Sequence, residues 1–205
     1  MTELGLFPLG VVLLPTEQIP LHIFEDRYRE LIGECLADGR EFGLVFADED
    51  GIREIGTRAA VTEVLERFDD GRMNVVVEGR ERFRLLELTG GRSFHTGVVE
   101  PLEDEGDDDA DPHEVRRALR LFDRLVELTG SDVEPPEPRT PLLSFALAAR
   151  FELAPELKQR LLVLRSERER VTLLVELLDA AARSVARQRE VAERAATNGK
   201  VEPRG

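Results

Sequence analysis

The segment "FPLGVVLLPTEQIPLHIFEDRYRELI", residues 7–32, decides how the chain begins to fold, because it joins apolar runs punctuated by proline to a helical pattern. Pro8, Pro15 and Pro20 cannot donate the hydrogen bonds of a β-ladder. They therefore confine the apolar pieces around them to short strands or extended edges. Over residues 25–37 apolar side chains recur at spacings of three and four, and a glycine suited to a C-terminal cap follows. We expect short edge strands that lead into one helix.

Strand signals dominate the rest of the first hundred residues. Runs rich in β-branched and aromatic residues lie at 41–47, 56–68, 72–79, 82–88 and 93–102. The separators Asp70-Gly71 and Gly90-Gly91 supply the positive φ that tight hairpins need. Five or six short strands of this kind must bury one face. The pattern therefore predicts a mostly antiparallel meander, closed or half-closed into a barrel, with one inserted helix.

After residue 111 the period of the apolar residues changes to 3.6, which predicts four amphipathic helices. Their starts are marked by Asp111-Pro112, by Thr140-Pro141, by Ala154-Pro155, and by Ser166 with Glu169 as a capping box. The first is expected to end at Gly130 and the second at about Phe151. Helices joined by short turns pack together. The fold class is therefore α+β, a β-domain followed by a C-terminal helical bundle.

The acidic run "EDEGDDDADP", residues 103–112, is the strongest boundary signal, because like charges repel and nothing apolar is available to bury. We expect an exposed linker at 103–111 between a β-domain at 1–102 and a helical subdomain at 112–196. A disordered tail is expected at 197–205. The glycine of the acidic run is misplaced for a calcium-binding loop.

Composition limits the partners that the protein can have. The formal net charge is −14, so a phosphate backbone would be repelled by the protein as a whole, and we expect no nucleic-acid partner. The arginines of "GRERFRL", residues 79–85, are expected to alternate on the solvent face of a strand. No run approaches the roughly 18 apolar residues of a membrane span, and a secretory signal is missing. We expect a cytoplasmic protein with no membrane partner, in which the single cysteine, Cys35, is a small buried residue of the inserted helix.

No motif indicates catalysis or a cofactor. The sequence "NGKV" at 198–201 lacks the first glycine and the hydroxyl of a phosphate-binding loop, and no serine lies in a G-x-S-x-G context. His22, His95 and His113 are far apart and do not have the spacing of metal ligands. We therefore expect no enzyme, no catalytic residue, no metal site and no cofactor.

The opening segment, together with "EIGTRAAVTEV" at 54–64 and "DGRMNVVVEGRERFRL" at 70–85, resembles the N-terminal domain of the Lon proteases. The resemblance runs from residue 4 to about residue 190. It is expected in a stand-alone form, because neither the ATPase motif nor a Ser-Lys peptidase arrangement is found. It implies a PUA-like mixed β-barrel followed by a helical bundle. The implied partners are unfolded or degron-bearing polypeptides, and a protease or a chaperone is a further candidate.

These observations favour a non-catalytic protein- or peptide-binding module. A strand edge beside exposed apolar side chains suits the addition of another extended polypeptide by main-chain hydrogen bonds. The candidate peptide-binding residues are Leu21, His22, Phe24 and Tyr28, for which packing inside the fold is the competing interpretation. Two other functions remain open. A small hydrolase of unrecognised type would need His22 or His95 beside a carboxylate of perturbed pKa, and a PUA-like RNA-binding protein would need a local basic face.

Overall fold

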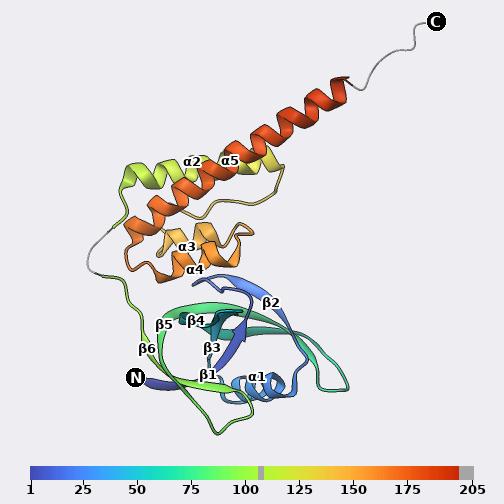
Figure 1. The fold of residues 1–205 in the computed structure, drawn as a ribbon, viewed down its shortest axis with the longest axis vertical. Coiled ribbons are helices and arrows are strands. Elements are labelled where there is room, and N and C mark those ends of the chain that lie inside the picture. Colours follow the sequence, from blue (N-terminus) through green and yellow to red (C-terminus); the bar gives the residue numbers. More distant parts are fainter. Residues whose placement is uncertain (106–108, 199–205) are drawn as a thin grey trace, which may run out of the picture.

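The computed structural model describes residues 1–105 and 109–198, and within this range it contains six strands and five helices. The strands and the first helix form one end of the molecule, and the other four helices form the opposite end (Figure 1). We call residues 2–101 the β-part and residues 112–198 the helical part. The predicted linker at 103–111 includes residues 106–108, and the predicted tail includes residues 199–205. Both of these segments lie outside the described residues.

The β-part is a mixed sheet with one inserted helix. Its elements are β1 (Thr2–Leu9), β2 (Gln18–Ile23), α1 (Asp26–Asp38), β3 (Phe42–Asp48), β4 (Gly51–Arg67), β5 (Met73–Thr89) and β6 (His95–Pro101). The hydrogen-bonded order is β2-β5-β4-β3-β1-β6, and β5 also pairs with β6, so the ladder returns to β5. Among the described strands only the pairing of β1 with β3 is parallel. The predicted β-rich first half, mostly antiparallel with one helix, is confirmed.

The two strands predicted at 72–79 and 82–88 form one continuous strand, β5. Its first half pairs with β2 and its second half with β6. In the ladder with β4, Thr57 pairs with Arg82 and Ala59 with Gly79, so three steps along β5 oppose two steps along β4. This extra residue is a β-bulge, which lets the strand bend without ending.

The apolar piece "GVVLL", predicted as a short strand or an extended edge, is not a strand, because residues 10–17 form an irregular crossing over β5. The crossing is close. A Cβ placed at Gly79 would lie 2.1 Å from the carbonyl oxygen of Leu14, so only glycine fits there. The hydroxyl of Thr57 donates to the carbonyl of Leu13 at 2.6 Å, which satisfies a backbone group that a strand would have paired.

Helix α1 packs its apolar face onto the inside of the sheet. Tyr28, Leu31, Ile32 and Cys35 are buried, and Gly39 ends the helix with a φ of 65°. The predicted helix, its glycine cap and the buried position of Cys35 are confirmed. Burial raises the pKa of the Cys35 thiol to about 11, which keeps it protonated and unreactive at neutral pH.

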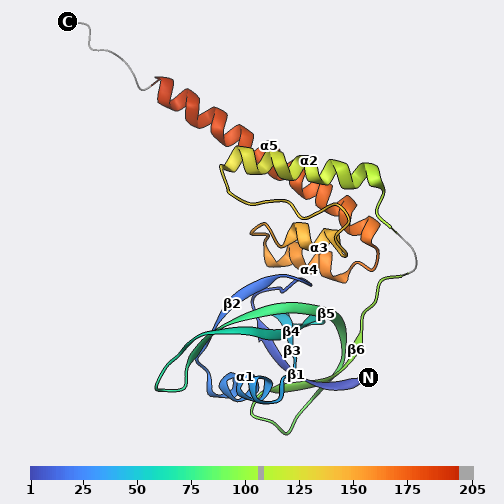
Figure 2. The ribbon, with the colours of Figure 1, turned by 180° about the vertical axis from the view of Figure 1, so that it is seen from behind.

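The helical part contains α2 (Pro112–Thr129), α3 (Leu143–Ala148), α4 (Pro155–Val163) and α5 (Glu167–Asn198). The predicted caps at Asp111 and Ser166 are confirmed, since each side chain accepts a backbone N–H of its helix. Helix α3 is shorter than predicted, because Leu142 has a φ of 53° and cannot belong to a right-handed helix. Figures 1 and 2 show α2 alongside α5, with α5 continuing beyond the other helices. No helix among the described residues is long and apolar enough to span a membrane.

One apolar cluster crosses from the β-part into the helical part. Val12, Leu14 and Ile55 share it with Phe145 and Leu161. Polar contacts reinforce the same contact region, which we call the joint. The amide of Gln159 donates to the carbonyl of Ile55 at 3.0 Å, and Lys158 of α4 pairs with the buried carboxylate of Glu17.

Candidate functional site

The four predicted peptide-binding residues lie where β2 passes into α1, but they do not share one face. His22 and Phe24 are exposed, with 59% of Phe24 accessible to solvent. Their rings stack with centroids 5.8 Å apart and an angle of 19° between the planes. Leu21 is half-buried and packs against the core of the β-part. Tyr28 is buried, with only 4% of its surface exposed.

Tyr28 packs inside the fold, which corrects its prediction as a residue of the exposed face. Its ring stacks on Phe7 with centroids 3.9 Å apart, and the guanidinium of Arg27 covers it at 4.7 Å from the ring centre. Burial raises the pKa of the Tyr28 hydroxyl, against the lowering effect of Arg27. Tyr28 therefore fixes the start of α1 and leaves Phe24 as the aromatic side chain that faces solvent.

Two neighbours of His22 were missed in the sequence. The ring of Phe68, in the turn between β4 and β5, meets His22 edge-on with centroids 6.1 Å apart. The Nδ1 atom of His22 lies 2.6 Å from Oδ1 of Asn74, whose amide donates to Glu66 at 3.2 Å. We call His22, Phe24 and Phe68 the aromatic patch. Only the register of β2 on β5, which sets His22 opposite Asn74, brings these residues together.

Beside the aromatic patch, β2 has an open edge, as its proline predicted. Among the described strands β2 pairs with β5 alone. The amide of Gly79 donates to the carbonyl of Glu17 at 2.8 Å, so the backbone groups of Glu17 face β5. In an antiparallel ladder successive residues face opposite sides of the strand, so the backbone groups of Gln18, Pro20 and His22 face away from β5. These groups face the open edge, where Pro20 offers a carbonyl but no N–H.

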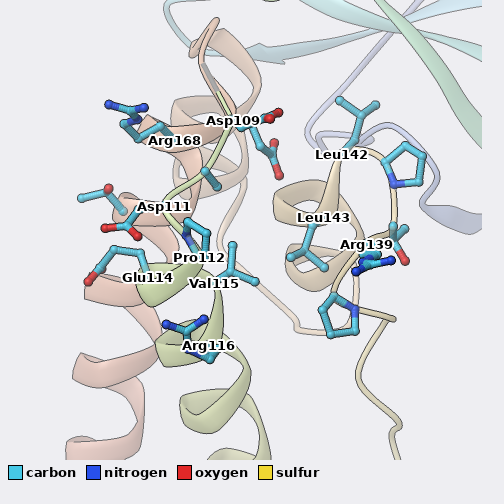
Figure 3. A pocket seen from close by; sticks show the side chains of 16 residues that line it. Asp109, Asp111, Pro112, Glu114, Val115, Arg116, Arg139, Leu142, Leu143 and Arg168 are labelled. Carbon is cyan, nitrogen blue, oxygen red and sulfur yellow. The ribbon is translucent and has the colours of Figure 1, made fainter. Parts of the chain in front are cut away.

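A pocket of about 1320 Å³ lies between the first turns of α2 and α5 and the connector at 138–143 (Figure 3). Its walls carry charges of both signs, including Asp111, Glu114, Arg116 and Arg139. Within the described residues no group of three or more His, Cys, Asp or Glu side chains could hold a metal ion. The pocket therefore combines volume with mixed charge, without a feature that selects one ligand.

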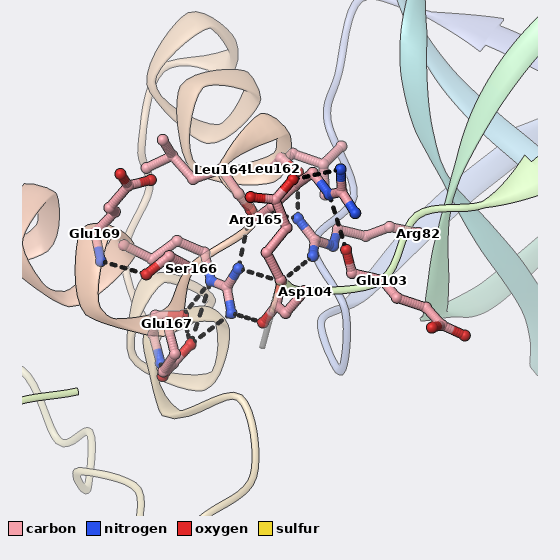
Figure 4. Close-up of polar contacts among 12 residues, drawn as sticks. Arg82, Glu103, Asp104, Leu162, Leu164, Arg165, Ser166, Glu167 and Glu169 are labelled. Carbon is pink, nitrogen blue, oxygen red and sulfur yellow. Dashed lines mark hydrogen bonds and ion pairs between the residues drawn. The ribbon is translucent and has the colours of Figure 1, made fainter. Parts of the chain in front are cut away.

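A buried ionic network ties the β-part to the helical part (Figure 4). Arg82 of β5 donates to the carbonyls of Leu162 and Leu164 at 2.8 and 2.6 Å and pairs with Asp104. Arg170 of α5 donates to Asp104 at 2.7 Å and to Glu167 at 2.8 Å. Burial would raise the pKa of Asp104, but its bonds to Arg170 and Arg82 hold that pKa below its ordinary value.

This network corrects two predictions. Arg82 was expected on the solvent face of its strand, but it is buried, because the bulge in β5 and the carbonyls at the end of α4 give it partners in the helical part. Asp104 was expected in a solvated linker, but it is partly buried between two arginines. The same prediction is confirmed for Arg80 and Arg84, which are exposed.

The histidines do not form the arrangement that a hydrolase would need. His22 meets the carboxamide of Asn74 and not a carboxylate. His95 is exposed on β6, and no carboxylate contact of His95 is found within residues 1–105 and 109–198. His113 is exposed at the start of α2, with Nδ1 3.4 Å from Glu114.

Comparison with known proteins places this geometry in context. Residues 3–180 match the family described as the ATP-dependent protease La (LON) substrate-binding domain. Lon proteases of Flavobacterium johnsoniae and Escherichia coli strain K12 are 29% identical over 118 residues and 26% identical over 194 residues. These matches cover 53% and 86% of this chain but only 14% and 24% of the two proteases. The chain therefore spans less than a quarter of their length.

Two solved structures are also similar. A Lon N-terminal domain protein from Xanthomonas campestris is 25% identical, with a TM-score of 0.69, over 86% of this chain and 98% of that one. The N-terminal domain of a Mycobacterium avium complex Lon protease has a TM-score of 0.66 over 87% of this chain and 98% of that one. Its identity is 16%, so this second similarity concerns the fold alone.

Proposed function

We propose that this chain, which belongs to the ATP-dependent protease La (LON) substrate-binding domain family, is a non-catalytic module that binds polypeptides. The observation that carries the proposal is the exposed Phe24, stacked on His22 beside the open edge of β2. The bound polypeptides are unfolded or degron-bearing chains, which expose both their backbone and their apolar side chains.

The two features of this surface complement each other. An exposed cluster of aromatic rings offers apolar area that a partner can cover, and such clusters mark interaction sites. The open edge of β2 offers backbone donors and acceptors, to which an extended segment can add as a further strand. A folded protein has few free strands to offer, so the combination favours unfolded segments.

The surface is held by rigid elements. The stack of Tyr28 on Phe7 fixes the first turn of α1, and an ion pair of 2.7 Å joins Arg27 to Glu25 just after Phe24. A binding surface that is fixed before the partner arrives loses less conformational entropy when it binds. This rigidity supports a role for Phe24 as an anchor.

Family membership also supports a proposal about where the module acts and which partners it has. It places the module in the cytoplasm, with a protease or a chaperone as the protein that receives the bound chain. It includes no cofactor and neither nucleic acid nor a membrane as partner. The formal net charge of −14 supports the exclusion of nucleic acid.

The test measures the binding of a fluorescently labelled protein that is kept unfolded by reduction and carboxymethylation. Fluorescence anisotropy gives the dissociation constant for the wild type, for Phe24→Ser and for Leu88→Ser. Leu88 is a similarly exposed apolar residue on the second half of β5. We expect Phe24→Ser to weaken binding about tenfold or more, as for the loss of an interface anchor, and Leu88→Ser to change it by less than about twofold.

Both variants should retain the wild-type circular dichroism spectrum, because both side chains are exposed. Failure of the wild-type protein to bind the unfolded chain would contradict the proposed function. Unchanged binding by Phe24→Ser would show that the aromatic patch is not the binding surface.

A further inference from the structure

A second pocket, of about 640 Å³, lies between the β-part and the helical part. Its walls are the loop at 15–16, Glu41 before β3, residues 78–82 of β5, the segment 101–104 at the end of β6, and Leu142 of the helical part. We call it the junction pocket. None of its walls includes a residue of the aromatic patch, so it is a separate feature of the surface.

The junction pocket opens over a break in the sheet. Strands β6 and β2 pair one after the other with the same edge of β5. The β6 ladder ends with Pro101 opposite Phe83, and the β2 ladder begins with Gln18 opposite Glu78. The bulge of β5 falls between these two ladders. Bulges of this kind occur often beside functional sites, where they redirect side chains.

Two strained residues meet at the same pocket. Within the described part of the chain, Thr16 and Leu142 are the two residues other than glycine with positive φ, at 68° and 53°. Both of them line the junction pocket. Left-handed backbone at such residues is costly and persists where the surrounding structure enforces it, often at functional sites. The strain is therefore concentrated at this pocket.

Leu142 is an unexpected residue for its position. Its side chain is 39% exposed although it is apolar. The fold uses its carbonyl, which accepts from the amides of Phe145 and Ala146, but any residue would provide that carbonyl. Asparagine or glycine would adopt the left-handed backbone more readily. Figure 3 shows Leu142 on the side nearest the strands, across from Asp111 and Glu114. Its apolar side chain lines the junction pocket and also the pocket drawn in Figure 3, so it lies on the surface between the two.

The rim of the junction pocket is acidic. Glu81 and Glu103 are exposed and make no ion pair within the described residues. Arg80 pairs with Glu78 at 2.7 Å, and Arg82 is held by Asp104, so neither arginine neutralises these two carboxylates. The apolar residues that line the pocket are Pro15, Pro101, Leu102 and Leu142. A pocket that combines apolar side chains with unpaired carboxylates is complementary to an apolar side chain that has a cationic neighbour.

We propose that the junction pocket is a second subsite for bound polypeptides, which takes an apolar side chain flanked by lysine or arginine. This inference rests on the proposed function and specifies the class of sequence that the module prefers. The walls come from both parts of the molecule, so an occupant would contact the β-part and the helical part together.

The test uses three labelled peptides of equal length. One carries leucines flanked by lysines, one carries the same leucines flanked by glutamates, and one carries serines flanked by lysines. Anisotropy titrations should show that the wild type binds the first peptide at least about ten times more tightly than the other two. Leu142→Asn should weaken binding of the first peptide about tenfold, the effect of losing one apolar contact in a pocket.

The thermal midpoint of Leu142→Asn should equal or exceed that of the wild type, because asparagine relieves the left-handed strain. The matched control is Leu86→Asn, an exposed leucine of β5 outside the junction pocket, which should bind as the wild type does. In the double variant Glu81→Gln, Glu103→Gln, the preference for lysine over glutamate neighbours should fall, with no change of fold.

The outcomes separate this inference from the proposed function. If Phe24→Ser loses binding while Leu142→Asn and the double variant bind as the wild type does, the subsite is wrong and the proposed function holds. If the wild type binds neither the peptides nor the unfolded protein, the proposed function fails and the subsite with it. If Leu142→Asn unfolds, an unchanged preference in the double variant still overturns the subsite.

Discussion

On the surface at the start of α1, ion pairs join neighbours in the sequence, whereas at the joint they join distant segments. Arg27 pairs with Glu25, and both side chains are about half exposed. Arg170 pairs with Asp104, 66 positions away, and the Arg170 side chain is fully buried. Exposed pairs contribute about 0 to 1 kcal/mol. A buried pair with one partner removed leaves an unpaired charge in the interior, which is far more costly.

This difference indicates which parts of the molecule can be substituted without loss of folding stability. The aromatic patch and its exposed ion pairs can vary with little effect on folding, so the patch is free to serve a partner. The joint needs all three charged groups, because Arg82 and Arg170 both donate to the carboxylate of Asp104. We therefore expect substitutions at the joint to act on stability and substitutions at the patch to act on binding.

The largest effect should come from Arg170→Met. This change leaves the carboxylate of Glu167 without its buried cation and leaves Asp104 with Arg82 alone. We expect the free energy of unfolding to fall by about 3–5 kcal/mol, measured by urea denaturation. The control is Arg183→Met in the same helix, whose exposed pair with Asp179 should contribute less than about 1 kcal/mol. Equal losses in the two variants would mean that the joint network does not stabilise the fold.

A smaller effect should follow from Tyr28→Leu. The change removes the stack on Phe7 and leaves unfilled space in a buried site. We expect a loss of about 1–3 kcal/mol in the free energy of unfolding, against less than about 0.5 kcal/mol for Phe24→Leu in the same segment. Thermal and urea unfolding of the two variants check this contrast. A larger loss for Phe24→Leu would reverse the roles assigned to the two rings.

The smallest effect should be the pH dependence of Asp104→Asn. The pKa of Asp104 is lower in the folded protein than the value of about 3.9 expected when unfolded. The stabilisation from its charge is therefore present above that unfolded pKa and is lost as the pH falls through the folded pKa. The pH-dependent part of the stability difference between wild type and variant should be smaller than the effects above, and it should shrink below about pH 4. Urea midpoints from pH 7 to pH 3 measure it, and a difference independent of pH would contradict the assigned role.

The local features were predictable from the sequence, and particular residues show why. Asp111, Gly130 and Ser166 act as caps through bonds to backbone groups within four positions. Pro20 marks an edge strand because it lacks an N–H, whatever its neighbours are. Cys35 lies on an apolar helix face and is buried there. Each of these predictions needs only a short window of sequence.

The candidate site was predictable only in part. Phe24 and His22 were predicted because they adjoin a proline-marked edge, and both are exposed there. Phe68 and Asn74 were missed, because they reach His22 only through the register of β2 on β5. Tyr28 was predicted to be exposed but is buried. Helical periodicity indicates that it lies on an apolar face, but not that Phe7 packs against that face.

The sequence by itself determined the division into a β-rich first half with one inserted helix and a helical second half, the caps at Asp111, Gly130 and Ser166, the open edge at Pro20 and the resemblance to the family. Only the tertiary structure decided that Arg82 and Asp104 are buried together, that β5 runs on through its bulge, and that Thr16 and Leu142 meet at one pocket. The reason is the range of the interactions. A cap or a period depends on residues within one or two turns, whereas these contacts depend on the path of the whole chain between them.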